Sequence, residues 1–176
     1  MSRESALQKR KRWLKNKQKY CLLDTETTGL GNNDKVVEIA IIDLDGKILL
    51  NTLVNPERKI PLDAERVHGI SNSMMKDAPS IEVVREEIRE ILQDRIMLAY
   101  NAKFDARMIR QTFNLNVKYE CLMYNVMEFY STGRYISLEK ATTHLRSENQ
   151  EHRALGDCYL CLKLLKTSLE TEDEAG

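Results

Sequence analysis

The sequence predicts an α/β fold in which a mixed five-stranded sheet is flanked by helices. Three apolar runs come first, and the second and third are joined by Asp45-Gly46, a strong hairpin signal. Beyond residue 80, helical and strand patterns alternate, as they do where helices connect parallel strands. An antiparallel start followed by this alternation indicates one mixed sheet covered by helices.

The strands are expected from apolar runs bounded by turn residues. The first is apolar throughout, which is typical of a central strand in a covered sheet. The expected strands are residues 20–23, 36–44, 47–54, 96–100 and 119–122.

The helices are expected from apolar side chains spaced three and four residues apart. The clearest pattern begins near Ser80, which is a suitable N-cap, and places Ile81, Val84 and Ile88 on one face. A loop punctuated by Pro56 and Pro61 is expected before it. The other expected helices are a basic one over 3–19, a short one after Ser71, one from Asp105 to about Asn114, and segments 124–130, 138–145 (capped by Ser137) and 153–169.

The chain of 176 residues suits one domain over 20–170, with a basic helical extension over 1–19 and an acidic tail over 171–176. No apolar run approaches the roughly 20 residues that a membrane span needs, and no signal peptide precedes the domain. The four cysteines are expected to be reduced, with Cys158 and Cys161 packed in the core and not forming a redox or zinc pair. These features predict a cytoplasmic protein without a membrane partner.

Charge is distributed unevenly along a chain whose formal net charge is zero. Residues 1–19 hold eight Lys or Arg against one Glu, and the remainder holds 19 basic and 26 acidic residues. Bulk charge therefore gives no support for nucleic-acid binding, which has to be local or carried by metal ions and the basic helix. Two interpretations of that helix stay open: an appendage docked by Trp13 and Leu14, or an arm that binds nucleic acid.

Carboxylates follow the ends of the expected elements. Asp24 and Glu26 end the first strand and point to the same side, where unpaired carboxylates are costly unless a cation joins them. Oxygen-only ligands favour magnesium or manganese over zinc. Asp105 follows the fourth strand, and Asp157 lies one turn into the last helix. The alternatives are a solvated turn for the first pair, a helix N-cap for Asp105 and a solvated first-turn acid for Asp157.

His152 lies five residues before Asp157, which corresponds to a rotation of roughly 140° on a helix. We therefore place His152 in the segment before the last helix, from which it can swing toward a site anchored by Asp157. Four acids and a histidine are the groups needed for two-metal hydrolysis at phosphorus, with the histidine taking a proton from water. Taken alone, His152 also fits a surface residue.

Three motifs resemble those of the DEDDh exonucleases in order and spacing. They are residues 24–29 (Asp-Thr-Glu-Thr-Thr-Gly), Asn101-x-x-Phe104-Asp105 and His152-x-Ala154-x-x-Asp157. This family includes the proofreading epsilon subunit of bacterial DNA polymerase III, and ribonuclease T and oligoribonuclease are its relatives. Residues 67–70 (Val-His-Gly-Ile) resemble a segment of the epsilon-like branch. The resemblance covers residues 20 to about 165.

The resemblance implies a ribonuclease H-like sheet and 3′–5′ removal of 5′-mononucleotides, with single-stranded DNA preferred and two Mg²⁺ or Mn²⁺ ions as cofactors. It implies that Asp24 bridges both ions, that Glu26 and Asp157 hold the nucleophile-side ion, that Asp105 holds the second through water, and that His152 is the general base. It also implies a pocket for the terminal nucleotide, lined by Thr25, Thr27, Leu30, His68, Asn101 and Phe104.

The expected partner is nucleic acid with a single-stranded 3′ end, and a polymerase or repair complex is a further one. The sequence stops soon after the last expected helix and shows no convincing sliding-clamp peptide, which favours a free-standing trimming or repair exonuclease. One alternative is an exoribonuclease resembling ribonuclease T, although residues 67–70 favour DNA. Another is an inactive module that binds nucleic acid or a polymerase, and the presence of all four acids and the histidine argues against it.

Overall fold

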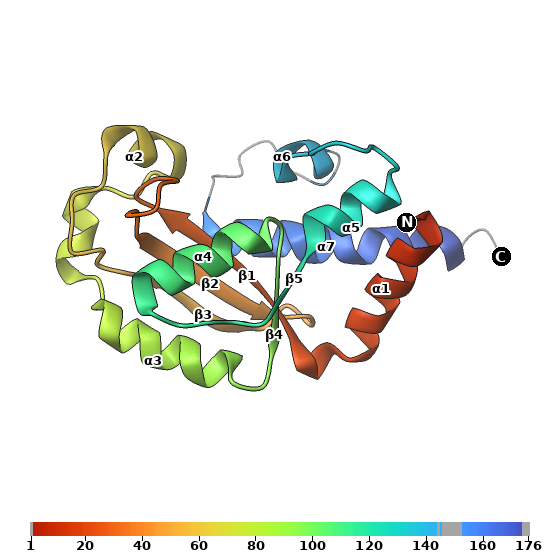
Figure 1. The fold of residues 1–176 in the computed structure, drawn as a ribbon, viewed down its shortest axis with the longest axis horizontal. Coiled ribbons are helices and arrows are strands. Elements are labelled where there is room, and N and C mark those ends of the chain that lie inside the picture. Colours follow the sequence, from red (N-terminus) through yellow and green to blue (C-terminus); the bar gives the residue numbers. More distant parts are fainter. Residues whose placement is uncertain (1, 144, 146–152, 174–176) are drawn as a thin grey trace.

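The computed structural model describes residues 2–143, 145 and 153–173 (Figure 1). Its centre is a five-stranded sheet in the order β3-β2-β1-β4-β5. The pairs β1–β2 and β2–β3 are antiparallel, whereas β1–β4 and β4–β5 are parallel, which confirms the mixed sheet. The strands are β1 Tyr20–Thr27, β2 Val36–Asp43, β3 Ile48–Leu53, β4 Ile96–Ala99 and β5 Tyr119–Cys121.

Helices cover both faces of this sheet. Alternation along β1 sends Leu22 into one core, with side chains of α1, α5 and α7, and Leu23 into the other, with side chains of α3 and α4. The helices are α1 Arg3–Lys15, α2 Leu62–His68, α3 Ile81–Leu92, α4 Ala102–Phe113, α5 Leu122–Phe129, α6 Leu138–Ala141 and α7 Ala154–Asp173, with 3₁₀ helices η1 Lys17–Lys19 and η2 Asn72–Asp77.

Local chemistry explains where several elements begin and end. Ser80 caps α3 by accepting a hydrogen bond from the amide of Val83, as expected. Asn114 ends α4 in the left-handed conformation, with φ of 53°. Gly46 has φ of 92° in the turn between β2 and β3, which glycine adopts without the strain that a Cβ would cause.

The structure differs from the sequence expectations in several elements, and the helix expected over 138–145 already ends at Ala141. Helix α2 lies where we expected a loop, because its seven residues are too few to show a helical period. Strand β1 continues to Thr27, so Asp24 and Glu26 lie within the strand. Helix α7 continues to Asp173, into the segment that we assigned to an acidic tail.

The basic helix α1 is docked on the domain. Trp13 is 1% exposed and lies in the core that α5 and α7 share, and Leu14 packs against that core. Arg10 is fully buried, donates hydrogen bonds to Asn125 and to the carbonyl of Leu164, and lies 4.5 Å from the centre of the Phe129 ring. The docking interpretation is therefore confirmed, and the nucleic-acid interpretation of this helix stays a prediction.

The four cysteines are free thiols, and Cys158 and Cys161 are buried in the core, as expected. Across the part of the chain that the structure describes, no helix has both the length and the apolar character that crossing a membrane would require.

Candidate active site

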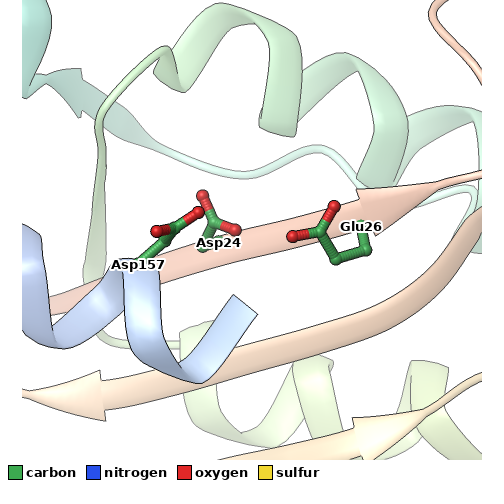
Figure 2. Close-up of side chains that lie close together, drawn as sticks. All are labelled: Asp24, Glu26 and Asp157. Atoms are coloured by element: carbon green, nitrogen blue, oxygen red, sulfur yellow. The ribbon is translucent and has the colours of Figure 1, made fainter. Parts of the chain in front are cut away.

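Three of the four predicted carboxylate ligands converge at one point. Asp24 and Glu26 share a face of β1, and Asp157 lies in the first turn of α7, which packs against that face. One oxygen from each carboxylate lies within 4.8 Å of the other two. Figure 2 shows the three carboxylates turned toward one another from the strand and the helix. The strand period and the docking of α7 are therefore sufficient to assemble this cluster.

The fourth predicted ligand, Asp105, lies in the first turn of α4, on the other side of β1. It is 4% exposed and accepts a hydrogen bond from the hydroxyl of Thr25 at 2.9 Å. Burial raises the pKa of Asp105 to about 7, although the hydrogen bond from Thr25 opposes that rise. Asp105 lines the same cavity as the three converging carboxylates, so all four acids border one space.

The three converging carboxylates disfavour one another's charges. Burial raises the pKa of Asp24 well above its ordinary value, and the charges of Asp105 and Asp157 add to the rise. Burial raises the pKa of Glu26 to about 8, and the charges of Asp157 and Glu38 add to it. Among the described residues, neither Asp24 nor Glu26 takes part in an ion pair. Carboxylate oxygens that remain partly accessible in such a cluster fit a hard divalent cation.

A cavity of about 210 Å³ opens beside the carboxylates. Three of the predicted pocket residues line it, namely Thr25, Asn101 and Phe104. The other side chains of its wall were not expected there, and they are Val67, Tyr100, Tyr135 and Leu138. Tyr135 comes from the connection after α5 and Leu138 from the start of α6, where no motif signals a site.

The other three predicted pocket residues do not belong to the cavity wall. Thr27 donates a hydrogen bond to the carbonyl of Gly29 and so shapes the turn after β1. Leu30 is 77% exposed on the loop that follows. His68 is buried, and its Nδ1 accepts a hydrogen bond from the amide of Ile70 at 3.0 Å. Consecutive helical residues differ by about 100° in direction, so Val67 reaches the cavity where His68 does not.

A further carboxylate, Glu38, lies next to the start of α7. The predicted general base, His152, lies outside the described residues. Glu38, which the sequence analysis missed, is buried in β2 and forms an ion pair with Arg153. The available signal for Glu38 was a carboxylate flanked on both sides by apolar residues of its strand.

A groove of about 460 Å³ shares Asn101 and Phe104 with the site cavity. Lys103, Arg107 and Arg110 line this groove, and no acidic residue belongs to its described lining. The groove is therefore a local basic surface next to the carboxylates, in a chain whose total charge is zero.

Comparison with known proteins places these features in a family. A family model described as Exonuclease (RNase_T) matches residues 21–165. The uncharacterized exonuclease CP81 of Escherichia phage 186 is 33% identical over 178 residues, which cover 90% of this chain and 91% of that relative. The DNA polymerase III subunit epsilon of Rickettsia felis is 36% identical over 100 residues, which cover 53% of this chain and 44% of that subunit. The match thus spans less than half of the length of that subunit.

Two solved structures have the same architecture. Exonuclease X, solved in complex with 5′ overhanging duplex DNA, is 31% identical, with a TM-score of 0.68 and coverage of 88% of this chain and 93% of that one. Exonuclease I of E. coli, solved in complex with a dA16 oligonucleotide, has a TM-score of 0.70 over 84% of this chain and 40% of that one. Its identity of 18% shows the fold alone.

The family model covers most of the chain, and the phage relative matches nearly end to end. These findings confirm the ribonuclease H-like fold and the prediction of a 3′–5′ exonuclease. The chain therefore belongs to the Exonuclease family.

Proposed function

We propose that this exonuclease removes mononucleotides from the 3′ end of DNA, with single-stranded ends preferred, by hydrolysis that depends on two divalent metal ions. The observation that carries the proposal is the convergence of Asp24, Glu26 and Asp157 beside a cavity lined by Asn101 and Phe104. That arrangement puts metal-ligating oxygens next to a space that a nucleotide can enter. The names of exonuclease X, solved with DNA, and of the epsilon subunits support DNA as the substrate.

Asp24, Glu26 and Asp157 would hold one Mg²⁺ or Mn²⁺ ion, and Asp24 with Asp105 would hold the second. When bound, such ions stabilise the charge on the attacking and leaving oxygens and lower the pKa of water. His152 would accept the proton of that water, because an imidazole titrates near neutral pH. These roles are the ones that the DEDDh resemblance implies, and the geometry of the three carboxylates supports them.

Phe104 and the basic groove would bind the nucleic acid. The Phe104 ring lines both cavities, and the guanidinium of Arg107 lies 5.3 Å from its centre, which limits the ring's movement. An aromatic face stacks on any base, so this contact tolerates sequence variation. Lys103 and Arg110 are exposed in the groove and can contact phosphates without regard to sequence.

A polymerase or repair complex as a partner, and a location in the cytoplasm, are parts of this proposal. The epsilon subunits among the relatives support the first. The free thiols support the second, because a reducing compartment keeps cysteines unpaired.

The test uses 5′-labelled single-stranded DNA, the RNA of matching sequence, circular single-stranded DNA and a 3′-blocked strand. We expect the linear DNA to shorten stepwise from its 3′ end with Mg²⁺ or Mn²⁺, and we expect EDTA or the 3′ block to stop it. Cleavage of the circle would contradict an exonuclease, and faster degradation of the RNA would contradict the assignment to DNA. His152→Ala should lose most of the rate and keep the rise in melting temperature that Mg²⁺ causes.

A further inference from the structure

Glu38 is a buried charge in the middle of an apolar strand. It is 3% exposed, and the register of the sheet places it directly opposite Glu26. Cross-strand neighbours point to the same face, so both carboxylates are directed toward α7. Like charges in this position are unfavourable, and burial increases the cost. Glu38 therefore needs a compensating contact.

That contact comes from two consecutive residues at the start of α7. The Arg153 Nε donates to both oxygens of Glu38, at 2.9 and 3.0 Å, and the Arg153 Nη2 donates as well. The amide of Ala154 donates to Glu38 Oε2 at 3.1 Å. One carboxylate therefore binds both a side chain and the backbone at the point where the helix begins.

Helix α7 needs this acceptor because its own sequence does not supply one at the position before its first residue. The first amides of a helix have no partner within it, and an arginine side chain offers only donors. Glu38 provides the acceptor from the neighbouring strand and adds a negative charge at the positive end of the helix dipole. The carbonyl of Arg153 in turn accepts a hydrogen bond from the amide of Asp157 at 3.1 Å. Glu38 is thus connected to Asp157 through a single residue.

The body of α7 has its own contacts with the region around β2. The Cys158 thiol lies 3.5 Å from the carbonyl of Ala40, and the Tyr159 hydroxyl donates to the carbonyl of Gly46 at 3.1 Å. Apolar packing in the core also holds the helix. Loss of the Glu38 contact should therefore loosen the first turn, which carries Asp157, and leave the remainder of α7 in place.

We propose that Glu38 and Arg153 are positioning residues, which fix the first turn of α7 so that Asp157 meets Asp24 and Glu26 at the metal centre. The part of this inference that concerns metal ions rests on the proposed function. The part that concerns the stability of the first turn of α7 is independent of the proposed function. Arg153 forms an ion pair with Glu38 and so offsets part of the repulsion that Glu38 adds at Glu26.

The test compares Glu38→Gln and Glu38→Ala with Tyr159→Phe, a control that removes a contact of α7 away from Asp157. The first readout is amide hydrogen exchange of the metal-free protein. We expect faster exchange confined to the first turn of α7 in both Glu38 variants and none there in the control. Unchanged exchange in that turn would overturn the proposal, whatever the protein's substrate is.

The second readout is the affinity for Mn²⁺, measured by titration calorimetry without nucleic acid. We expect both Glu38 variants to bind at least about tenfold more weakly, which is the usual cost of losing a group that orients a metal ligand. Arg153→Ala should also weaken binding, and the double variant Glu38→Ala/Arg153→Ala should be no worse than Glu38→Ala, because Glu38→Ala already removes the contact with Arg153. Cleavage should show a lower kcat with little change in KM. If the Glu38 variants bind Mn²⁺ as tightly as the wild type, the contact between Glu38 and Arg153 does not position Asp157 for metal binding, and the proposal is wrong.

The calorimetry also separates this inference from the proposed function. A wild-type protein that binds Mn²⁺ and does not shorten DNA would contradict the proposed substrate and leave the positioning role intact. The melting temperatures of all variants identify any that fail to fold. Glu38→Gln keeps the size and one acceptor of the original side chain, so we expect the surrounding core to stay packed in this variant.

Discussion

Two buried centres of charge in this molecule are built in opposite ways. Where α1 meets α5, Arg10 is fully buried and donates to Asn125 and Leu164, and Lys9 forms an ion pair with Glu128. Where β1 meets α7, carboxylates face one another, and the described ion pairs leave out Asp24 and Glu26. The charged side chains of the first centre have partners within the folded chain. We propose that divalent cations complete the second.

The pKa shifts of the charged groups also differ between the two centres. Burial lowers the pKa of Arg10 to about 10, so Arg10 stays charged at neutral pH. Burial raises the pKa of Asp105 to about 7 and that of Glu26 to about 8, so without ions these acids hold protons near neutrality. Metal binding at the second centre must therefore release protons, and its affinity should rise with pH. A charge that has partners in the folded chain is typical of a structural role, whereas carboxylates that face one another favour a ligand site.

The largest expected effect is on catalysis, from Asp24→Asn. This change removes a central ligand at nearly constant volume and should lower cleavage by about a thousandfold or more. The metal-free variant should be as stable as the wild type or more so, because a repulsive charge is gone. Thermal melts with and without Mg²⁺, alongside cleavage rates, check both expectations. Asp94→Asn, at an exposed position, is the control, and near-normal cleavage by Asp24→Asn would remove Asp24 from the site.

The converse experiment disturbs the α1 centre. Trp13→Ala should lower the free energy of unfolding by about 3–5 kcal/mol, because it empties a fully buried aromatic site. The affinity of the folded protein for Mn²⁺ should not change, since Trp13 lies on α1, whose main neighbour is α5. Urea denaturation in EDTA and calorimetry measure the two quantities. A loss of ion affinity without a loss of stability would contradict the separation of the two centres.

The pH dependence of stability should also reflect the carboxylates of the second centre. The folded-state pKa values of Glu26 and Asp105 lie above their ordinary values, so the protonated forms favour the folded state. Their contribution is fully present below about pH 4, where both acids are also protonated when unfolded, and it is lost as pH rises through about 7 and 8. In EDTA the melting temperature should therefore fall between pH 5 and pH 9. Mg²⁺ should reduce that fall, and a curve that Mg²⁺ leaves unchanged would count against a carboxylate metal centre.

The smallest expected effect concerns the basic groove. The double variant Lys103→Gln/Arg110→Gln should weaken binding of a long single strand and reduce the slope of log affinity against log salt by about 1.4. Turnover of a dinucleotide, which does not reach Arg110, should change little. Lys47→Gln/Lys163→Gln removes two exposed cations outside the groove and serves as the control. Equal salt slopes for the two double variants would show that the groove does not bind the strand.

The strands and the four acids could be predicted from the sequence because each depends on local pattern. The two-residue period of a strand places Asp24 and Glu26 on one side, and the hairpin signal at Asp45-Gly46 fixes how β2 and β3 pair. Contacts between distant segments have no such signal. Glu38 and Arg153 lie 115 residues apart, so the role of Glu38 depends on how α7 docks.

Helix phase and connecting segments account for the remaining differences. His68 was expected at the pocket, and the rotation of α2 directs Val67 there instead. Tyr135 reaches the site from a connection whose path is set by tertiary packing, which no periodicity in the sequence describes. Cavity-lining residues close to a motif can therefore be predicted to within about one position in the sequence. Those that come from connecting segments cannot.

The most direct test of the account is anomalous diffraction from crystals of the protein soaked in Mn²⁺. The account predicts one anomalous peak within ligand distance of Asp24, Glu26 and Asp157, and a second between Asp24 and Asp105. Asp24→Asn crystals should lose both peaks. Crystals that show manganese only away from these carboxylates would contradict the claim that this carboxylate cluster is completed by divalent cations.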